Sequence, residues 1–400
     1  MRRDEAEHLP AFSQRIIVNH CPPGCFCLDQ VRCRVNGSVS PSVPQDLPSA
    51  LVDLTITHSA LSTLHSGDLA NYKWLKRLII EHTALRHIGP YAFQNLPDLR
   101  ELSIRKNREL RQLSRFSLGG MRVKSLSLFL SDNAIETIQP NSFYNSRGLR
   151  VLDLQDNPVE ELVEGTFSGL YMADFVKLPR GIEKLEADIF RNCSRIHVLS
   201  IPGLNVTELP THAFRGLQRL KKLDLNDANI GTIQANAFEG LSTVEQVHIR
   251  SSRIRRLKRR SFAGMNNVGQ LLVERSVLGR LERRALAAVS ADSLRLRANR
   301  LHCTCHNVRL LSEHGFDLPE RFLRDNYCGT PRSLADRALA DLPSLYTSNC
   351  AAPGPDDEQD AKASHSYYYA DDLTSSAPLT QPPHFTLAFC IILRSAFASI

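Results

Sequence analysis

Residues 149–157 read Leu-Arg-Val-Leu-Asp-Leu-Gln-Asp-Asn, and this pattern decides the fold because it recurs along most of the chain. Leu152 and Leu154 alternate with Asp153, which is the period of two expected of a β-strand with one buried side. Phe167 closes the unit before the pattern restarts. A single unit cannot bury its apolar side alone, so we expect the copies to stack on one another.

The unit recurs at a spacing of 24 residues, with slips of one or two residues at three units. Stacked copies predict a solenoid with one parallel sheet, whose polar alternate side chains line a concave surface. The unit at Val123 carries an additional Phe129-Leu130 between its strand leucines and Asn133, and the unit at Ala173 lacks the asparagine. The eleven units begin at Leu51, Leu75, Leu99, Val123, Leu149, Ala173, Ile196, Leu220, Val244, Val268 and Ala291.

Two residue types recur once per unit and have predictable roles. The asparagine can bond to the backbone where the chain leaves the strand. The phenylalanine is expected to pack in the core as a spine on the convex side. The asparagines are Asn107, Asn133, Asn157 and Asn299. The phenylalanines are Phe93, Phe116, Phe143, Phe167, Phe190, Phe214, Phe238 and Phe262.

The composition argues for a folded binding protein. Of the 400 residues, 42% are hydrophobic and 23% are charged, which is enough apolar material for a continuous core and argues against general disorder. The chain contains no G-x-S-x-G, no H-E-x-x-H and no glycine-rich phosphate loop, and its histidines are dispersed. We therefore expect no enzyme activity, no metal and no cofactor, and a function that consists of binding another macromolecule.

Eight of the ten cysteines form two clusters that bracket the repeats. Even clusters are typical of structural disulfides in an oxidising compartment, although close-set cysteines also make zinc sites. Neither cluster has the paired C-x2-C knuckles of common zinc modules, which favours disulfides, and three pairings are open in each cluster. Cys193 and Cys390 have no obvious mates, and we expect Cys193 to be a buried free thiol, with an intermolecular disulfide as the alternative. The clusters are Cys21, Cys25, Cys27 and Cys33, and Cys303, Cys305, Cys328 and Cys350.

These clusters resemble the caps of extracellular leucine-rich-repeat proteins, a family that includes Slit, the Nogo receptor, platelet glycoprotein Ib and the variable lymphocyte receptors. The motifs are Cys-Pro-Pro-Gly-Cys-Phe-Cys at 21–27 and Cys-Thr-Cys at 303–305, so the resemblance covers residues 21–350. It implies an α/β repeat fold, a leucine-rich-repeat solenoid with a parallel concave sheet and a disulfide cap at both ends. The family often has a proline and a tryptophan before the second motif, and this chain departs from that, which leaves the packing of the C-terminal cap open. The resemblance also implies the pairs Cys21–Cys27, Cys25–Cys33, Cys303–Cys328 and Cys305–Cys350.

The predicted organisation places caps at 21–50 and 301–350 and the repeats at 51–300. Residues 1–20 read as a leader remnant without an apolar core, which indicates a truncated start or unconventional export. Residues 351–384 read as a disordered acidic stalk, in which Tyr367, Tyr368 and Tyr369 are candidates for sulfation. Residues 385–400 read either as a weak signal for a GPI anchor or as an end without function. Candidate glycosylation sites are Asn36, Asn192 and Asn205.

Two surfaces are candidates for binding. The first is the concave sheet of the middle repeats, the usual docking face of this family. The second is basic, because residues 244–300 hold fourteen Lys or Arg against four acidic residues, a net of +10 compared with +7 for the whole chain. The period should bring Arg255 and Arg256 near Arg280. The concave positions are Val151, Asp153, Gln155, Lys222, Asp224 and Asn226. The basic positions are Arg250, Arg253, Arg255, Arg256, Lys258, Arg259, Arg260, Arg280, Arg283, Arg284, Arg295 and Arg297, the last two on the concave side.

The favoured function is therefore an extracellular or cell-surface protein-binding module with a basic patch for a ligand such as heparan sulfate. An acidic protein surface fits the same charge, whereas nucleic acid fits the charge but not the compartment. A membrane enters only through a lipid anchor. A solvated basic face, or one neutralised by the acidic tail, is the alternative to a ligand site. Two other classes remain open: an intracellular adaptor with free thiols, and a fragment of a larger multidomain protein.

Overall fold

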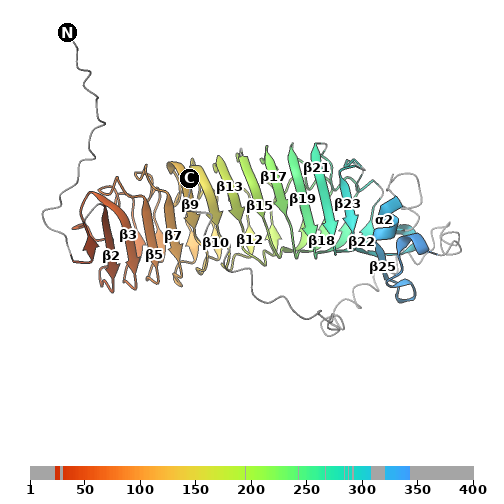
Figure 1. Ribbon diagram of the computed structural model, residues 1–400, viewed down its shortest axis with the longest axis horizontal. Coiled ribbons are helices and arrows are strands. Elements are labelled where there is room, and N and C mark those ends of the chain that lie inside the picture. The colour runs from red at the N-terminus through yellow and green to blue at the C-terminus, as the bar shows by residue number, and fades with distance from the viewer. Residues whose placement is uncertain are drawn as a thin grey trace, which may run out of the picture. The chain divides into compact units, whose positions relative to one another are not determined.

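The computed structural model describes residues 23–342, apart from Leu28, Asp29, Ser194, Ser242, Asn266, Arg283, Ala287, Ala291 and the segment 308–319. The leader 1–20, the stalk 351–384 with its tyrosines, the tail 385–400 and Cys390 lie outside the described residues. The described part of the chain is a solenoid in which each repeat adds one strand to a main sheet, as Figure 1 shows.

The main sheet has thirteen strands in chain order, and all neighbours pair in parallel except the antiparallel β1 and β2 at its first edge. Eleven of these strands, from β3 to β23, correspond to the eleven predicted units, which confirms the parallel solenoid. The strands are β1 (Cys25–Phe26), β2 (Val31–Asn36), β3 (Leu51–Thr57), β5 (Arg77–Glu81), β7 (Glu101–Arg105), β9 (Arg122–Phe129), β11 (Arg147–Asp153), β13 (Met172–Lys177), β15 (Arg195–Ser200), β17 (Leu220–Asp224), β19 (Val244–Arg250), β21 (Val268–Glu274) and β23 (Leu294–Arg297).

A second set of short strands follows the turns that leave the main sheet. In the earlier repeats these are two-residue strands: β4 (Thr63–Leu64), β6 (His87–Ile88), β8 (Gln112–Leu113), β10 (Thr137–Ile138), β12 (Glu161–Leu162) and β14 (Lys184–Leu185). In the later repeats they form a parallel six-stranded ladder: β16 (Asn205–Leu209), β18 (Asn229–Ile233), β20 (Arg253–Leu257), β22 (Val277–Leu281), β24 (Arg300–His302) and β25 (Tyr327–Thr330).

Helices are few among the described residues and belong to the C-terminal cap. They include α2 (Glu320–Asp325), η1 (Arg332–Leu334) and η2 (Leu339–Asp341). The second side of the repeats is thus built from strands and turns.

The recurring asparagines bond to the backbone as expected. Asn133 donates from Nδ2 to the carbonyls of Ile104 and Leu130, both at 2.7 Å, and Asn157 repeats this with Leu130 and Leu154. Asn299 does the same toward Val273. Because the amide is buried, these bonds satisfy backbone groups that water cannot reach.

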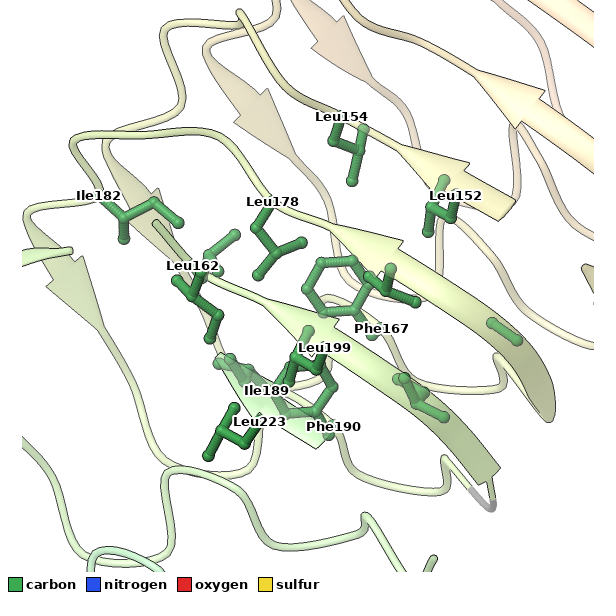
Figure 2. Close-up of a cluster of buried hydrophobic side chains, with 14 of the residues drawn as sticks. Leu152, Leu154, Leu162, Phe167, Leu178, Ile182, Ile189, Phe190, Leu199 and Leu223 are labelled. Carbon is green, nitrogen blue, oxygen red and sulfur yellow. The ribbon is translucent and has the colours of Figure 1, made fainter. Parts of the chain in front are cut away.

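The phenylalanine spine exists, with one exception. From Phe143 to Phe262 each ring stacks on the next, and Figure 2 shows Phe167 and Phe190 side by side among leucines from successive strands. The prediction was wrong for Phe116, which is only half-buried and stacks at the surface on Tyr91. Leu118, fully buried, takes the spine position in that repeat. The sequence pattern counted phenylalanines and missed that the register here favours the leucine two residues later.

The extra residues of the 123 unit lie elsewhere than predicted. Leu128 pairs with Leu152, and Leu130 is fully buried, so both are ordinary core positions. The register shifts instead earlier, between Arg147 and Val151 opposite the start of β9. Gly148 has a φ of +79° there, and a Cβ on it would lie 2.0 Å from the carbonyl oxygen of Val123, so the bulge requires glycine.

The caps carry two of the implied disulfides among the described residues. Cys25 pairs with Cys33, and Cys303 pairs with Cys328, which confirms these two pairings. Cys27 and Cys305 are also disulfide-bonded. Their implied mates, Cys21 and Cys350, lie outside the described residues.

Candidate binding surfaces

The exposed side of the main sheet, called here the open face, carries alternate strand residues from every repeat. In its middle, Val151 of β11, Phe175 of β13 and Val198 of β15 lie in register on adjacent strands. Phe175 is 46% exposed, an unusual state for a phenylalanine, and the two valines are half-buried. These three residues form a continuous apolar strip across three adjacent strands of the open face.

Asp153, Arg105 and the half-buried ring of Phe129 border the apolar strip. Phe129 pairs with Asp153, and the Arg105 guanidinium lies 5.7 Å from the Phe129 ring centroid. Asp153 is 9% exposed, and its carboxylate accepts the backbone N–H of Gln155 at 3.1 Å. Asp153 therefore holds the turn after β11 and is less available to a partner than the sequence suggested.

Beyond the strip, β17 and β19 hold a half-buried polar cluster around His248. Asp224 pairs with Lys222 at 2.8 Å, and Arg250 with Glu274 at 3.4 Å. His248 lies in register with Asp224, and burial lowers the pKa of His248, with Lys222 and Arg250 lowering it further. Four buried polar atoms here have no hydrogen-bond partner within the described protein: Asp224 Oδ1, Asn226 Oδ1, His248 Nδ1 and Arg250 Nε.

The structure divides the predicted basic residues between two surfaces. Arg250, Arg295 and Arg297 lie on the open face, where Arg297 is in register with Glu274. Arg253, Arg255 and Arg256 lie on β20, and Arg280 lies on β22. Lys258, Arg259, Arg260 and Arg284 lie in the turns that follow β20 and β22. Arg283 lies outside the described residues.

We call the residues on β20 and β22 and in the following turns the basic side. Arg256 and Arg280 are direct neighbours in the ladder, as the repeat period predicted. Neighbouring strands are about 4.8 Å apart, so these charges lie within one Debye length of about 8 Å and act together. Within the described part of the chain, the side chains of Arg255, Arg256 and Arg280 have no ion-pair partner.

The other predicted positions are distributed over the surface. Asn36 and Asn205 are exposed at strand ends, and Asn192 is exposed beside Cys193. Cys193 is a buried free thiol that donates to the carbonyl of Phe167 at 2.9 Å, and burial raises its pKa to about 12. Among the residues described, no group of three or more His, Cys, Asp or Glu is placed to hold a metal. No described helix is long and apolar enough to cross a membrane.

Sequence reasoning missed Phe175 and His248. Both occupy strand positions that alternate with buried residues, so the period could have placed them on the open face. The signal that could have singled out Phe175 was the replacement of a polar residue by phenylalanine at one such position.

Comparison with known proteins agrees with this architecture. The model of the BspA type leucine-rich repeat region matches in six copies over residues 49–150, 70–197 and 136–269. Asporin of Bos taurus is 26% identical over 159 residues, which are 37% of this chain and 42% of asporin. Human leucine-rich repeats and immunoglobulin-like domains protein 1 is 30% identical over 149 residues, 37% of this chain and 13% of that protein. The matched region thus spans less than half of these relatives.

Among solved structures, a chain in the octameric complex of Latrophilin 3, Unc5D and the leucine-rich repeats of FLRT2 has a TM-score of 0.53 at 18% identity. The match covers 82% of this chain and 99% of the other chain. At 18% identity it shows a similar fold and no more. The repeat period, the parallel main sheet and the matched repeat model together show that this chain belongs to the leucine-rich-repeat family.

Proposed function

We propose that this chain is an extracellular recognition module that docks a protein partner on its open face. The observation that carries the proposal is the strip of Val151, Phe175 and Val198, because an exposed apolar patch rimmed by polar residues is typical of interaction sites. The half-buried cluster around His248 adjoins the strip, since Val198 is in register with Lys222. The disulfides at both caps support an oxidising, extracellular environment. The FLRT2 repeats in the solved complex likewise assemble with other proteins.

The test is an unbiased screen of the full chain, secreted behind an added leader, against displayed cell-surface and secreted proteins. Phe175→Ser should weaken the recovered interaction at least about tenfold, as for a central aromatic contact. Trp74→Ser is the matched control, because Trp74 is 61% exposed but lies outside the sheet strands. Equal binding by both variants would move the interface away from the strip.

A second function is supported by a separate observation: on the basic side, the side chains of Arg255, Arg256 and Arg280 have no ion-pair partner among the described residues. It suits a sulfated polysaccharide of the heparan sulfate type, because a linear polyanion can contact cations that repeat from one turn to the next. The test is elution from a heparin column. Changing Arg255, Arg256, Arg259 and Arg260 to Ser should lower the eluting salt, whereas an unchanged eluting salt excludes this surface as the site.

The extracellular location is tested by the thiols and the glycans. Protein recovered from the secretory pathway should expose few free thiols under denaturing conditions, whereas eight or more reactive thiols would favour the intracellular adaptor. Removal of N-linked glycans should reduce the mass at Asn36 or Asn205, whose side chains are exposed. A lipid anchor at residues 385–400 stays a prediction, tested by release from cells with a phosphatidylinositol-specific phospholipase.

A further inference from the structure

One row of left-handed residues runs through the corner that follows the second-side strands. We call it the corner row, and its members have φ between +55° and +73°. Each backbone N–H donates to the carbonyl of the next member at 2.8–3.3 Å, so the row is a continuous hydrogen-bonded ladder along the solenoid. The members are Tyr91, Phe116, Asn141, Gly165, Asp188, His212, Asn236, Arg260 and Arg284.

The left-handed region favours glycine and, among other residues, Asn, Asp and His. The five middle members of the corner row follow this preference, from Asn141 to Asn236. Its two ends do not. Residues held in an unfavourable backbone region point to a role that the fold alone does not require.

The two ends of the corner row differ in the side-chain contacts that offset the unfavourable backbone conformation. Tyr91 and Phe116 stack on each other at 5.5 Å, and the Arg115 guanidinium lies 5.0 Å from the Phe116 ring, so packing accounts for those side chains. Arg260 and Arg284 are exposed, and their side chains have no hydrogen bond, ion pair or ring contact within the described residues. No such contact among the described residues accounts for arginine at these two places.

We infer that Arg260 and Arg284 contact a linear sulfated polysaccharide, and that with Arg256 and Arg280 they form one site of four guanidinium groups. Arg256 and Arg280 are adjacent in the ladder, and Arg260 donates its backbone N–H to Arg284 at 3.2 Å, so the four residues form two neighbouring pairs. Within a repeat the two arginines are four residues apart, a span of at most about 14 Å. This inference rests on the proposed polysaccharide binding and names the residues of that site.

The experiment uses the full chain and heparin as the probe. The double variant Arg260→Asn/Arg284→Asn places at both corners the residue that Asn141 and Asn236 already supply. We expect it to bind heparin more weakly, with the slope of log affinity against log salt reduced by about two, by analogy with other linear polyanions. We also expect its melting temperature to rise by about 1–3 °C, because Asn is less strained there. A loss of affinity with a gain in stability is not what a structural role would produce.

Two matched variants complete the test. Arg295→Asn/Arg297→Asn removes the same charge from the open face and should leave the heparin slope unchanged. Asn236→Arg should add one cation to the corner row beside Arg260 and raise the slope by about one. If the corner variant binds like the wild type while Arg256→Ser/Arg280→Ser weakens binding, the inference is wrong and the proposed polysaccharide binding stands. If the wild type is not retained by heparin, the inference and the proposed polysaccharide binding are both wrong.

Discussion

Two regions of the same solenoid differ in the balance of basic and acidic residues on their surfaces. Residues 75–243 carry twenty-two basic and nineteen acidic residues, whereas residues 244–300 carry fourteen basic and four acidic. In the first region, cations bond to carboxylates one repeat away: Arg86 to Glu109, Arg111 to Glu136, Lys184 to Glu161, Arg191 to Glu164 and Arg215 to Asp188. On the basic side, Arg256 has another arginine, Arg280, as its neighbour.

This difference indicates that the repeat fold forms without the ion pairs between neighbouring repeats. Exposed ion pairs contribute about 0–1 kcal/mol each, and both regions form the same two-sided repeat. The core of the second region is also less regular. The phenylalanine spine ends at Phe262, Leu286 follows at the surface of a small apolar cavity of about 20 Å³, and Phe322 of the cap lines its other wall. The later repeats thus combine neighbouring arginines, Arg256 and Arg280, with a small cavity in the core.

The largest loss of stability should come from a substitution in the phenylalanine spine of the first region. Phe190 is fully buried between Phe167 and Phe214, so Phe190→Ala should cost about 3–5 kcal/mol. Leu286→Ala, at the existing cavity, should cost less. Urea unfolding of both variants measures the difference, and an equal cost would show that the two regions are packed equally well.

A smaller effect of opposite sign is expected from filling the cavity. Leu286→Phe would extend the spine beyond Phe262 and should stabilise the protein by about 0.5–2 kcal/mol. The same unfolding assay applies, with Leu223→Phe as a control because Leu223 is fully buried on β17 and does not line the cavity. A destabilised Leu286→Phe variant would mean that the cavity is too tight for a ring.

Lowering the pH should destabilise the second region before the first. The lowered pKa of His248 means that its contribution to stability is complete above the unfolded pKa of about 6.5 and is lost as pH falls below it. Hydrogen bonding from Arg215 lowers the pKa of Asp188, so that group loses its contribution only near pH 4 and below. Between pH 7 and 5, hydrogen-exchange protection should therefore fall in β19 and not around Asp188. His248→Gln should abolish that fall, and an unchanged profile would contradict the assignment.

The smallest change in stability should come from adding an acidic ion-pair partner for an arginine of the basic side. Thr232 lies in register with Arg256, so Thr232→Glu should create a cross-strand pair like those upstream and add about 0.2–1 kcal/mol. It should also lower the salt needed for elution from heparin. Thr232→Gln is the uncharged control, and equal elution of the two variants would show that pairing does not govern binding.

Much of this organisation could be predicted from the sequence because repeat periods translate directly into neighbours. The 24-residue period placed Arg256 beside Arg280 and the asparagines at their turns, and the family resemblance supplied Cys25–Cys33 and Cys303–Cys328. Local register could not be predicted, because Phe116 and Leu118 are both apolar. Only the packing of the folded chain determines that Leu118 occupies the spine position. The corner row was also out of reach, because φ is a backbone property that residues as different as Asn236 and Arg260 share.

The central claim is that Arg256 and Arg280 on the basic side bind a polyanion and that the ion-paired cations upstream, such as Arg191 and Arg215, do not. Heparin affinity measured by titration calorimetry across a range of salt tests it directly on three proteins: the wild type, Arg256→Ser/Arg280→Ser and Arg191→Ser/Arg215→Ser. Both variants lose two positive charges, so net charge is matched. The account predicts that the salt slope falls by about two in the first variant and stays at the wild-type value in the second. An equal fall in both variants would show that heparin responds to net charge alone and would contradict the account.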